Sequence, residues 1–137
     1  MFRAVVEGGF SATHQVRLRG GALEPVHGHD WRVRLHLVAS ELDEQDMVVD
    51  FLHAQAVLRS VLDRLHHTDL AACSGLRGRN PTAERVAQYV YQQVEAGGLP
   101  MIAAVEVTEA PGCVAVYAPG GAGAGGLASI DPHDGHS

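Results

Sequence analysis

The sequence predicts an α+β domain in which two helices cover one face of a four-stranded antiparallel sheet. Three observations lead to this fold class. Apolar and polar residues alternate over residues 27–39, which is typical of a half-buried strand. Two later segments, 51–65 and 83–94, carry apolar residues at helical spacing. Both segments lie between two pairs of predicted strands, and this order is typical of helices packed on a single sheet face.

The first strand is predicted in two pieces. Residues 2–6 and 10–16 have strand-like composition, and Gly8-Gly9 between them favours a bulge or bend. Residues 17–25 contain a second glycine pair and are predicted to form a loop or a wide hairpin connection. The strands on either side of this loop can therefore pair antiparallel.

The strand over residues 27–39 has two different faces because its side chains alternate in direction. One face carries histidines at its start and large apolar residues after them. Its members are His27, His29, Trp31, Val33, Leu35 and Leu37. His36 falls on the opposite face together with two arginines, so we expect it to be solvated.

The first helix is predicted to begin after Asp50, a good N-cap residue, and to end near residues 66–67. Its apolar residues recur at the spacing of one helix face. They are Phe51, Ala54, Val57, Leu58, Val61, Leu62 and Leu65. His53 lies outside this stripe and is expected to be exposed.

The second helix is predicted to begin at the Asn-Pro pair of residues 80–81 and to end at the glycine pair of residues 97–98. Its apolar stripe lies within residues 83–94. Two further strands follow over residues 101–109 and 113–117, joined by a tight turn. These elements complete the predicted four-stranded sheet.

The composition is that of one globular domain followed by a tail. The chain has 137 residues, of which 46% are hydrophobic, and this is enough for one core. We assign residues 1–118 to the domain and the Gly/Ala-rich residues 119–137 to a disordered tail without hydrophobic periodicity. His133 and His136 lie in this tail and are expected to play no part in a site.

Charge and cysteine content exclude several functional classes. The net charge of −6 argues against binding to nucleic acid or to an anionic membrane surface. No segment has the pattern of a signal peptide or the length of a membrane span. Cys73 and Cys113 are too few for a disulfide scaffold, so we interpret both as structural free thiols of a cytoplasmic protein.

Three histidines form the clearest candidate site. His27 and His29 are two residues apart on a predicted strand, so their side chains point to the same face. Gly28 between them leaves the approach to both rings open. His14 lies on the neighbouring predicted strand, from which it can reach the same point. Three imidazoles with a fourth position left open are typical of a catalytic zinc site.

Six short blocks of the sequence, taken together, resemble one enzyme family. The blocks are Phe10-Ser11-Ala12-Thr13-His14, His27-Gly28-His29-Asp30-Trp31, Met47-Val48-Val49-Asp50-Phe51, Leu65-His66-His67, Asn80-Pro81-Thr82-Ala83-Glu84 and Val107-Thr108-Glu109-Ala110-Pro111. In this order they resemble the 6-pyruvoyltetrahydropterin synthase / 6-carboxytetrahydropterin synthase family. The resemblance covers roughly residues 2–117.

The resemblance implies the tunnelling fold, in which trimers close a twelve-stranded barrel and two trimers stack into a homohexamer. It implies a zinc ion held by His14, His27 and His29, and the substrate 7,8-dihydroneopterin triphosphate. Glu109 matches the glutamate that anchors the pterin ring, and a carboxylate on an apolar strand face independently favours a binding role. Thr82 lies where the family contacts the pterin, although it is equally suited to cap a helix.

The family's general base is a cysteine shortly before the histidine pair, and this chain departs from that pattern. Residues 20–26 contain no cysteine, and Glu24 is their only ionisable residue. A subset of the family is thought to use a glutamate near this place, so Glu24 is our candidate base; the alternative is a solvated loop residue. As a base, Glu24 needs either a raised pKa or a substrate that zinc has acidified.

A second departure concerns the catalytic dyad. His67 matches the catalytic histidine of the family, but His66 stands where the family usually has an aspartate. Asp63 lies four residues before His67 and can face it if the helix extends that far. Asp69 is a poorer alternative. We therefore expect His67 to act with His66 or Asp63 as its neighbour.

Three functions remain open at this point. The first is a zinc-dependent lyase that forms 6-carboxytetrahydropterin on the route to deazapurine nucleosides such as queuosine. The second is a family member that forms 6-pyruvoyltetrahydropterin or 6-hydroxymethyl-dihydropterin. The third is a zinc- and pterin-binding protein with little catalysis. A glutamate directed at the metal would favour either enzyme over the binding protein. Product analysis distinguishes the two enzymes from each other.

Overall fold

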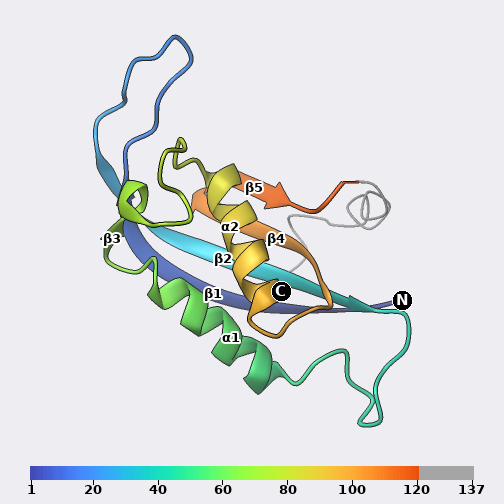
Figure 1. The fold of residues 1–137 in the computed structure, drawn as a ribbon. Helices are drawn as coiled ribbons and strands as arrows, with labels where there is room; N and C mark the ends of the chain where they lie inside the picture. The colour runs from blue at the N-terminus through green and yellow to red at the C-terminus, as the bar shows by residue number, and fades with distance from the viewer. Residues whose placement is uncertain (121–137) are drawn as a thin grey trace.

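A computed structural model describes residues 1–120 of the chain (Figure 1). A single sheet has the strand order β3-β1-β2-β4-β5. Its strands are β1 (Phe2–His14), β2 (His27–Ala39), β3 (Thr68–Asp69), β4 (Ile102–Ala110) and β5 (Cys113–Tyr117). The predicted tail is described only at residues 119 and 120, and His133 and His136 lie outside the described residues.

The sheet is five-stranded and mixed, which corrects the prediction of four antiparallel strands. The additional strand, β3, has two residues and pairs in parallel with Ala12 and Thr13 of β1. Two residues are too few to show any alternation of apolar and polar side chains, so no sequence pattern indicates this strand. The other strand pairs are antiparallel, as predicted.

Strand β1 pairs with β2 without interruption from Phe2 opposite Ala39 to His14 opposite His27. The bulge predicted at Gly8-Gly9 is therefore wrong. The glycine at position 8 serves close packing instead, because a β-carbon there would lie 3.0 Å from Leu62 and 3.1 Å from Leu58 of the first helix. Its small size lets that helix lie directly on the sheet.

Both helices, α1 (Phe51–Asp63) and α2 (Ala83–Ala96), lie on the same face of the sheet, as predicted (Figure 1). The side chain of Asp50 caps α1 by accepting a hydrogen bond from the backbone N–H of Leu52 at 2.9 Å. Thr82 caps α2 in the same way through the N–H of Arg85. A short 3-10 helix, η1 (Leu70–Ala72), follows β3.

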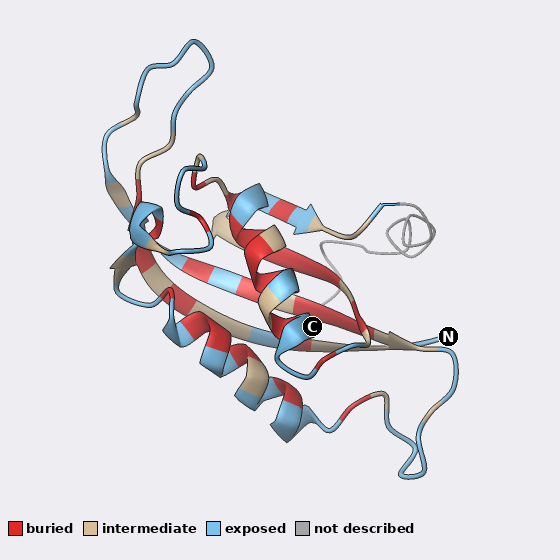
Figure 2. Cartoon of the chain, viewed as in Figure 1, coloured by how far each residue is buried: buried red, intermediate tan, exposed pale blue. Residues whose placement is uncertain are grey.

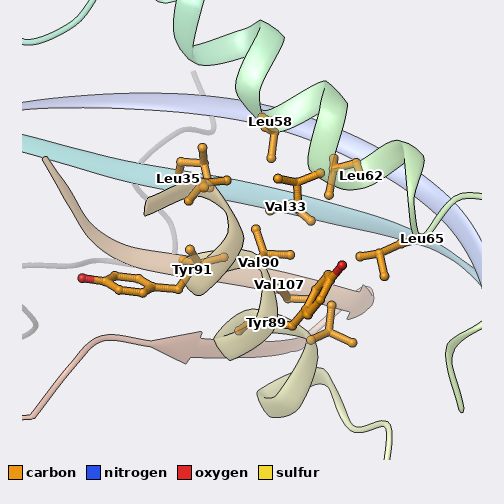
Figure 3. Close-up of a cluster of buried hydrophobic side chains, with 14 of the residues drawn as sticks. Val33, Leu35, Leu58, Leu62, Leu65, Tyr89, Val90, Tyr91 and Val107 are labelled. Atoms are coloured by element: carbon orange, nitrogen blue, oxygen red, sulfur yellow. The ribbon is translucent and has the colours of Figure 1, made fainter. Parts of the chain in front are cut away.

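The hydrophobic core lies between the helices and the sheet (Figure 3). The helix sides that face the sheet are buried and the outer sides are exposed, as Figure 2 shows. Leu58 and Leu62 of α1 pack toward Val33 of β2, and Val90 of α2 packs toward Val107 of β4. The predicted stripe of α1 is wrong at Phe51, which is 56% exposed at the start of the helix. His53 is exposed, as predicted.

The opposite face of the sheet holds a network of charged side chains with a buried centre. His36 is 1% exposed, which corrects the prediction that it is solvated. Its Nε2 atom lies 2.5 Å from a carboxylate oxygen of Glu106, which also contacts Arg34 at 3.3 Å. Arg34 pairs in turn with Glu7 of β1 at 2.9 Å. Polar residues on this face thus pair with one another across neighbouring strands, and of these four His36 and Glu106 are buried while Glu7 is exposed.

None of the helices in the described part of the chain is long and apolar enough to cross a membrane.

Candidate metal centre and adjoining cavity

The pairing of β1 with β2 brings the three predicted histidines together. His14 lies directly opposite His27, and His29 lies opposite Ala12, two positions from His14. The ring centroids are 4.8 Å apart for His14 and His27 and 4.4 Å apart for His27 and His29. The end of one strand and the beginning of the next therefore place three imidazoles around one point.

The ring of His14 is completely buried and its tautomer is determined by a hydrogen bond. Its Nδ1 atom lies 2.9 Å from the carbonyl oxygen of Pro81, just before α2. A carbonyl oxygen only accepts, so Nδ1 carries the proton and donates it. The Nε2 atom of His14 is then left with a lone pair that points into the cluster. A histidine that binds a metal is commonly held by this kind of hydrogen bond at its other ring nitrogen.

Glu109 joins the histidines as a fourth member of the cluster. Its Oε1 atom lies 2.7 Å from Nε2 of His14 and 3.4 Å from Nε2 of His29. The register between β4 and β5 shifts between Thr108 and Ala110, so Glu109 lies at an irregularity of this strand pair. The family resemblance implies that Glu109 binds the pterin, but no sequence signal indicates its contact with the histidines.

The four side chains fit a metal ion. Their ligand atoms all lie within 4.8 Å of one another. The Nε2 atoms of His14 and His29 are buried and have no hydrogen-bond partner among the described residues, although a carboxylate oxygen is close to both. An unprotonated ring nitrogen facing a carboxylate is repelled unless a cation or a second ring proton lies between them. Imidazole nitrogens with one carboxylate oxygen are a donor set that suits zinc.

Glu24 reaches the edge of this cluster from the long segment 15–26 that projects away from the sheet (Figure 1). The Nε2–H of His27 donates to Oε1 of Glu24 at 2.8 Å, and the backbone N–H of Val16 donates to the same oxygen at 3.3 Å. The hydrogen bond from His27 is the main reason that the pKa of Glu24 is lowered. Glu24 is therefore ionised at neutral pH, and its pKa moves opposite to the increase that would make it a stronger base.

A cavity of about 450 Å³ adjoins the histidine cluster. His29 lines it from the histidine cluster, and His67 lines it from the connection between α1 and β3. Gly28 also lies in its wall, where a side chain would be nearest to Thr13 at 3.7 Å, so the glycine keeps this approach open. The cavity therefore brings a predicted metal ligand and the predicted catalytic histidine to one space.

His67 is partnered by His66 and by neither predicted carboxylate. The two rings stack with their centroids 3.7 Å apart. Helix α1 ends at Asp63, so the helical continuation that would bring this carboxylate toward His67 is absent. Asp69 accepts a hydrogen bond from the N–H of Ala71 and caps η1. Glu24 contacts His27 and Val16 rather than His67.

Thr82 and the two cysteines are the remaining candidate residues of the sequence. Thr82 caps α2 and directly follows Pro81, whose carbonyl oxygen holds His14. This position links the start of α2 to the histidine cluster. Cys73 is half-buried, Cys113 is exposed, and both are free thiols.

Comparison with known proteins agrees with this arrangement. Residues 4–120 match the family described as 6-pyruvoyl tetrahydropterin synthase. The chain is 33% identical over 107 residues to a 6-carboxy-5,6,7,8-tetrahydropterin synthase of Synechocystis sp., covering 73% of this chain and 80% of that protein.

Two solved structures show the same fold. The 6-pyruvoyl tetrahydropterin synthase of Caenorhabditis elegans superposes with a TM-score of 0.73 at 20% identity, over 87% of this chain and 97% of that one. The enzyme of the same name from Plasmodium vivax gives a TM-score of 0.68 at 18% identity, over 85% and 96% of the two chains.

Proposed function

Because the chain belongs to the 6-pyruvoyl tetrahydropterin synthase family, we propose that it is a zinc-dependent lyase that converts 7,8-dihydroneopterin triphosphate into 6-carboxy-5,6,7,8-tetrahydropterin. The observation that carries the proposal is the convergence of His14, His27 and His29 beside a cavity that also exposes His67. The 33% identity to the Synechocystis enzyme supports the choice of product.

The histidine cluster is the proposed zinc site. His14, His27 and His29 hold the ion, and the carbonyl of Pro81 fixes the ring of His14. When bound, zinc supplies Lewis-acid polarisation of substrate oxygens, which makes an adjacent carbon-bound proton easier to remove.

Glu24 and His67 are the proposed proton-transfer groups. Glu24 is ionised and so is in the correct state to accept a proton from the substrate side chain. Because its pKa is low, it depends on a substrate proton that has already been acidified. His67 then accepts or delivers the second proton from its place in the cavity wall.

Glu109 and Thr82 are the proposed pterin-binding residues. A carboxylate can accept two hydrogen bonds from the amide and amino groups of a pterin ring. In this structure Glu109 lies against His14 and His29. Binding the pterin would therefore draw its carboxylate away from the histidines.

A second enzyme activity remains a candidate, in which the product is 6-pyruvoyltetrahydropterin or 6-hydroxymethyl-dihydropterin. The observation in its favour is Glu24, which lies at the cluster where most of the family has a cysteine. Two Plasmodium vivax 6-pyruvoyltetrahydropterin synthase structures carry substitutions of a glutamate described as a catalytic residue of that enzyme. A zinc- and pterin-binding protein with little catalysis is the third possibility.

The proposed setting is a cytoplasmic homohexamer, built as two stacked trimers, on the route to deazapurine nucleosides such as queuosine. Strand β5 lies at one edge of the sheet and has no strand beyond it in a single chain, and ring closure would remove such edges. The neighbouring chain would then complete the pocket around the pterin.

Product analysis tests the proposal directly. Zinc-loaded protein is incubated with 7,8-dihydroneopterin triphosphate, and the products are identified by mass spectrometry beside a His27→Ala control. We expect 6-carboxytetrahydropterin from the wild type and none from the control. Formation of 6-pyruvoyltetrahydropterin instead would establish the second candidate. Binding without turnover would establish the third.

A further inference from the structure

His67 has a backbone conformation that few residues other than glycine adopt. Its φ angle is +58°, in the left-handed region where glycine is the ordinary residue. The position lies shortly after the end of α1, where a glycine commonly reverses the chain. A histidine held in this conformation is strained, and strain of this kind persists where the surroundings enforce it.

Ser11 of β1 helps to hold His67 in this conformation through hydrogen bonds of its backbone carbonyl and N–H groups. The carbonyl oxygen of Ser11 accepts a hydrogen bond from the backbone N–H of His67 at 2.6 Å. The N–H of Ser11 donates to Nδ1 of His66 at 3.1 Å. One residue of the strand therefore holds the backbone of one histidine and the ring of the other.

The hydrogen bond from Ser11 determines the state of the His66 ring. A backbone N–H only donates, so Nδ1 of His66 must offer a lone pair, and the ring proton lies on Nε2. The two histidine rings lie nearly parallel, with an angle of 28° between their planes and centroids 3.7 Å apart. The hydrogen bond from Ser11 thus holds the ring of His66, and the ring of His67 stacks against it.

Nearby carboxylates are engaged elsewhere and leave this role to His66. Asp30, which lines the same cavity, accepts a hydrogen bond from the hydroxyl of Ser11 at 2.6 Å. Asp69 caps η1. The ring of His67 is therefore oriented by stacking instead of by hydrogen bonding to an acid.

We propose that His66 is a positioning residue: pinned by the backbone N–H of Ser11, its ring holds the His67 imidazole toward the cavity beside His29. This inference rests on the proposed function, because it assigns His66 a role in orienting a proton-transfer group of that reaction. A misplaced catalytic group reduces the rate without changing how substrate binds, so the effect falls on kcat and not on KM.

Two variants distinguish the stacking ring of His66 from its hydrogen bond to Ser11, and a third is a matched control. His66→Ala removes both the ring that stacks on His67 and the Nδ1 atom that accepts from Ser11. His66→Phe keeps an aromatic ring for stacking but lacks the Nδ1 acceptor. His53→Ala alters an exposed histidine of α1. We expect His66→Ala to lower kcat by about 10²-fold with KM and zinc content unchanged. His66→Phe should recover about tenfold of that loss, and His53→Ala should behave as wild type.

Two measurements on the free protein do not depend on turnover. Nitrogen-15 spectra at about pH 8, above the ordinary histidine pKa, should place the His66 proton on Nε2. Exchange of the Ser11 amide hydrogen should become at least about fivefold faster in both His66 variants, since each lacks the acceptor.

The outcomes distinguish this inference from the proposed function. Wild-type kcat in His66→Ala, or a proton on Nδ1 of His66, overturns the positioning role and leaves the proposed function in place. A change in KM or zinc content with unchanged kcat also overturns it. Wild-type protein that converts no pterin triphosphate overturns the proposed function, even where the spectra and the Ser11 exchange agree with the pinned ring.

Discussion

The Nε2 atom of His14 lies 2.7 Å from Oε1 of Glu109 while its Nδ1 atom donates to the carbonyl of Pro81. Two acceptor atoms at this distance repel each other, and the buried position of His14 excludes the water that would weaken the repulsion. A cation between them removes the conflict. A second proton on His14 would also remove it, so metal analysis decides between the two.

We expect purified protein to carry about one zinc ion per chain, with zinc–nitrogen distances of about 2.0–2.1 Å. His27→Ala should lose the metal, because only two imidazoles remain. Glu109→Gln should keep it, since all three histidines are intact. Metal content by mass spectrometry and distances by X-ray absorption test this. Wild type that neither contains zinc nor binds it on titration contradicts the zinc site.

Replacing Glu24 by glutamine keeps its shape and polarity but removes its ability to accept a proton. Turnover should fall by ~10²-fold or more, the usual contribution of a positioned general base. Zinc and pterin binding should remain nearly unchanged. Glu44→Gln, in an exposed turn, is the matched control. If Glu24→Gln works at the wild-type rate, Glu24 is a bystander and the base lies among His66, His67 and Asp69.

Because His67 has a left-handed conformation, replacing it by glycine should affect stability and activity differently. His67→Gly should leave the free energy of unfolding unchanged or raise it by up to about 1 kcal/mol, because strain is relieved. Turnover should fall by ~10²-fold or more as a proton-transfer group is lost. His53→Gly, inside α1, should instead destabilise by about 1 kcal/mol. Urea unfolding measures the free energy of unfolding of both glycine variants. A strong destabilisation by His67→Gly would contradict the strain at this position.

Two buried tyrosines predict a loss of stability at alkaline pH. Burial raises the pKa of Tyr89 and that of Tyr91, whose hydroxyl donates to the carbonyl of Ile102 at 3.2 Å. In the unfolded chain these groups lose their protons at about pH 10, before the folded protein does. Their contribution is therefore fully present below about pH 10 and is lost as the pH rises through the raised values.

Urea unfolding at about pH 8 and about pH 11 tests this sign. The wild type should lose more stability between the two pH values than the double variant Tyr89→Phe/Tyr91→Phe, which has no proton to release at these positions. Equal losses in both proteins would show that other groups cause the alkaline unfolding.

Assembly into a hexamer predicts a particle of six chains in light scattering at micromolar concentration. Val116→Lys, on the open edge strand β5, should shift the population toward smaller species, because charge discourages edge pairing. Leu52→Lys, on the 76% exposed position of α1, should leave the mass unchanged. A stable monomer of the wild type at this concentration would contradict the hexamer.

Local patterns were sufficient to predict the elements that carry the site. The alternation over β2 and the cap at Asp50 are short-range signals that the structure confirms. The start of α2 was predicted two residues too early, because Thr82 caps this helix instead of Asn80 and Ala83 is its first residue. The spacing of His27 and His29 likewise fixed their common face. His14 could be added because consecutive strands usually pair.

The contacts that sequence analysis missed are long-range. Glu109 reaches His14 across 95 positions of the chain only because β4 pairs with β2 and then departs from its regular register. His36 is buried by Glu106, which lies 70 positions away. The hydrogen bonds of Ser11 to the His66-His67 pair depend on β3, which is too short to leave a pattern.

The uninterrupted pairing of β1 with β2 makes this site sensitive to the length of a strand as well as to its ligands. His14 and the core residue Val6 share one face of β1, eight positions apart. Deleting one residue between them puts the two on opposite faces, because side chains alternate strictly along a strand. Keeping the metal ligand inward would then turn Val6 out of the core, and keeping Val6 inward would remove His14 from the metal. A single-residue deletion at Gly9 would thus separate metal binding from folding stability without changing any ligand.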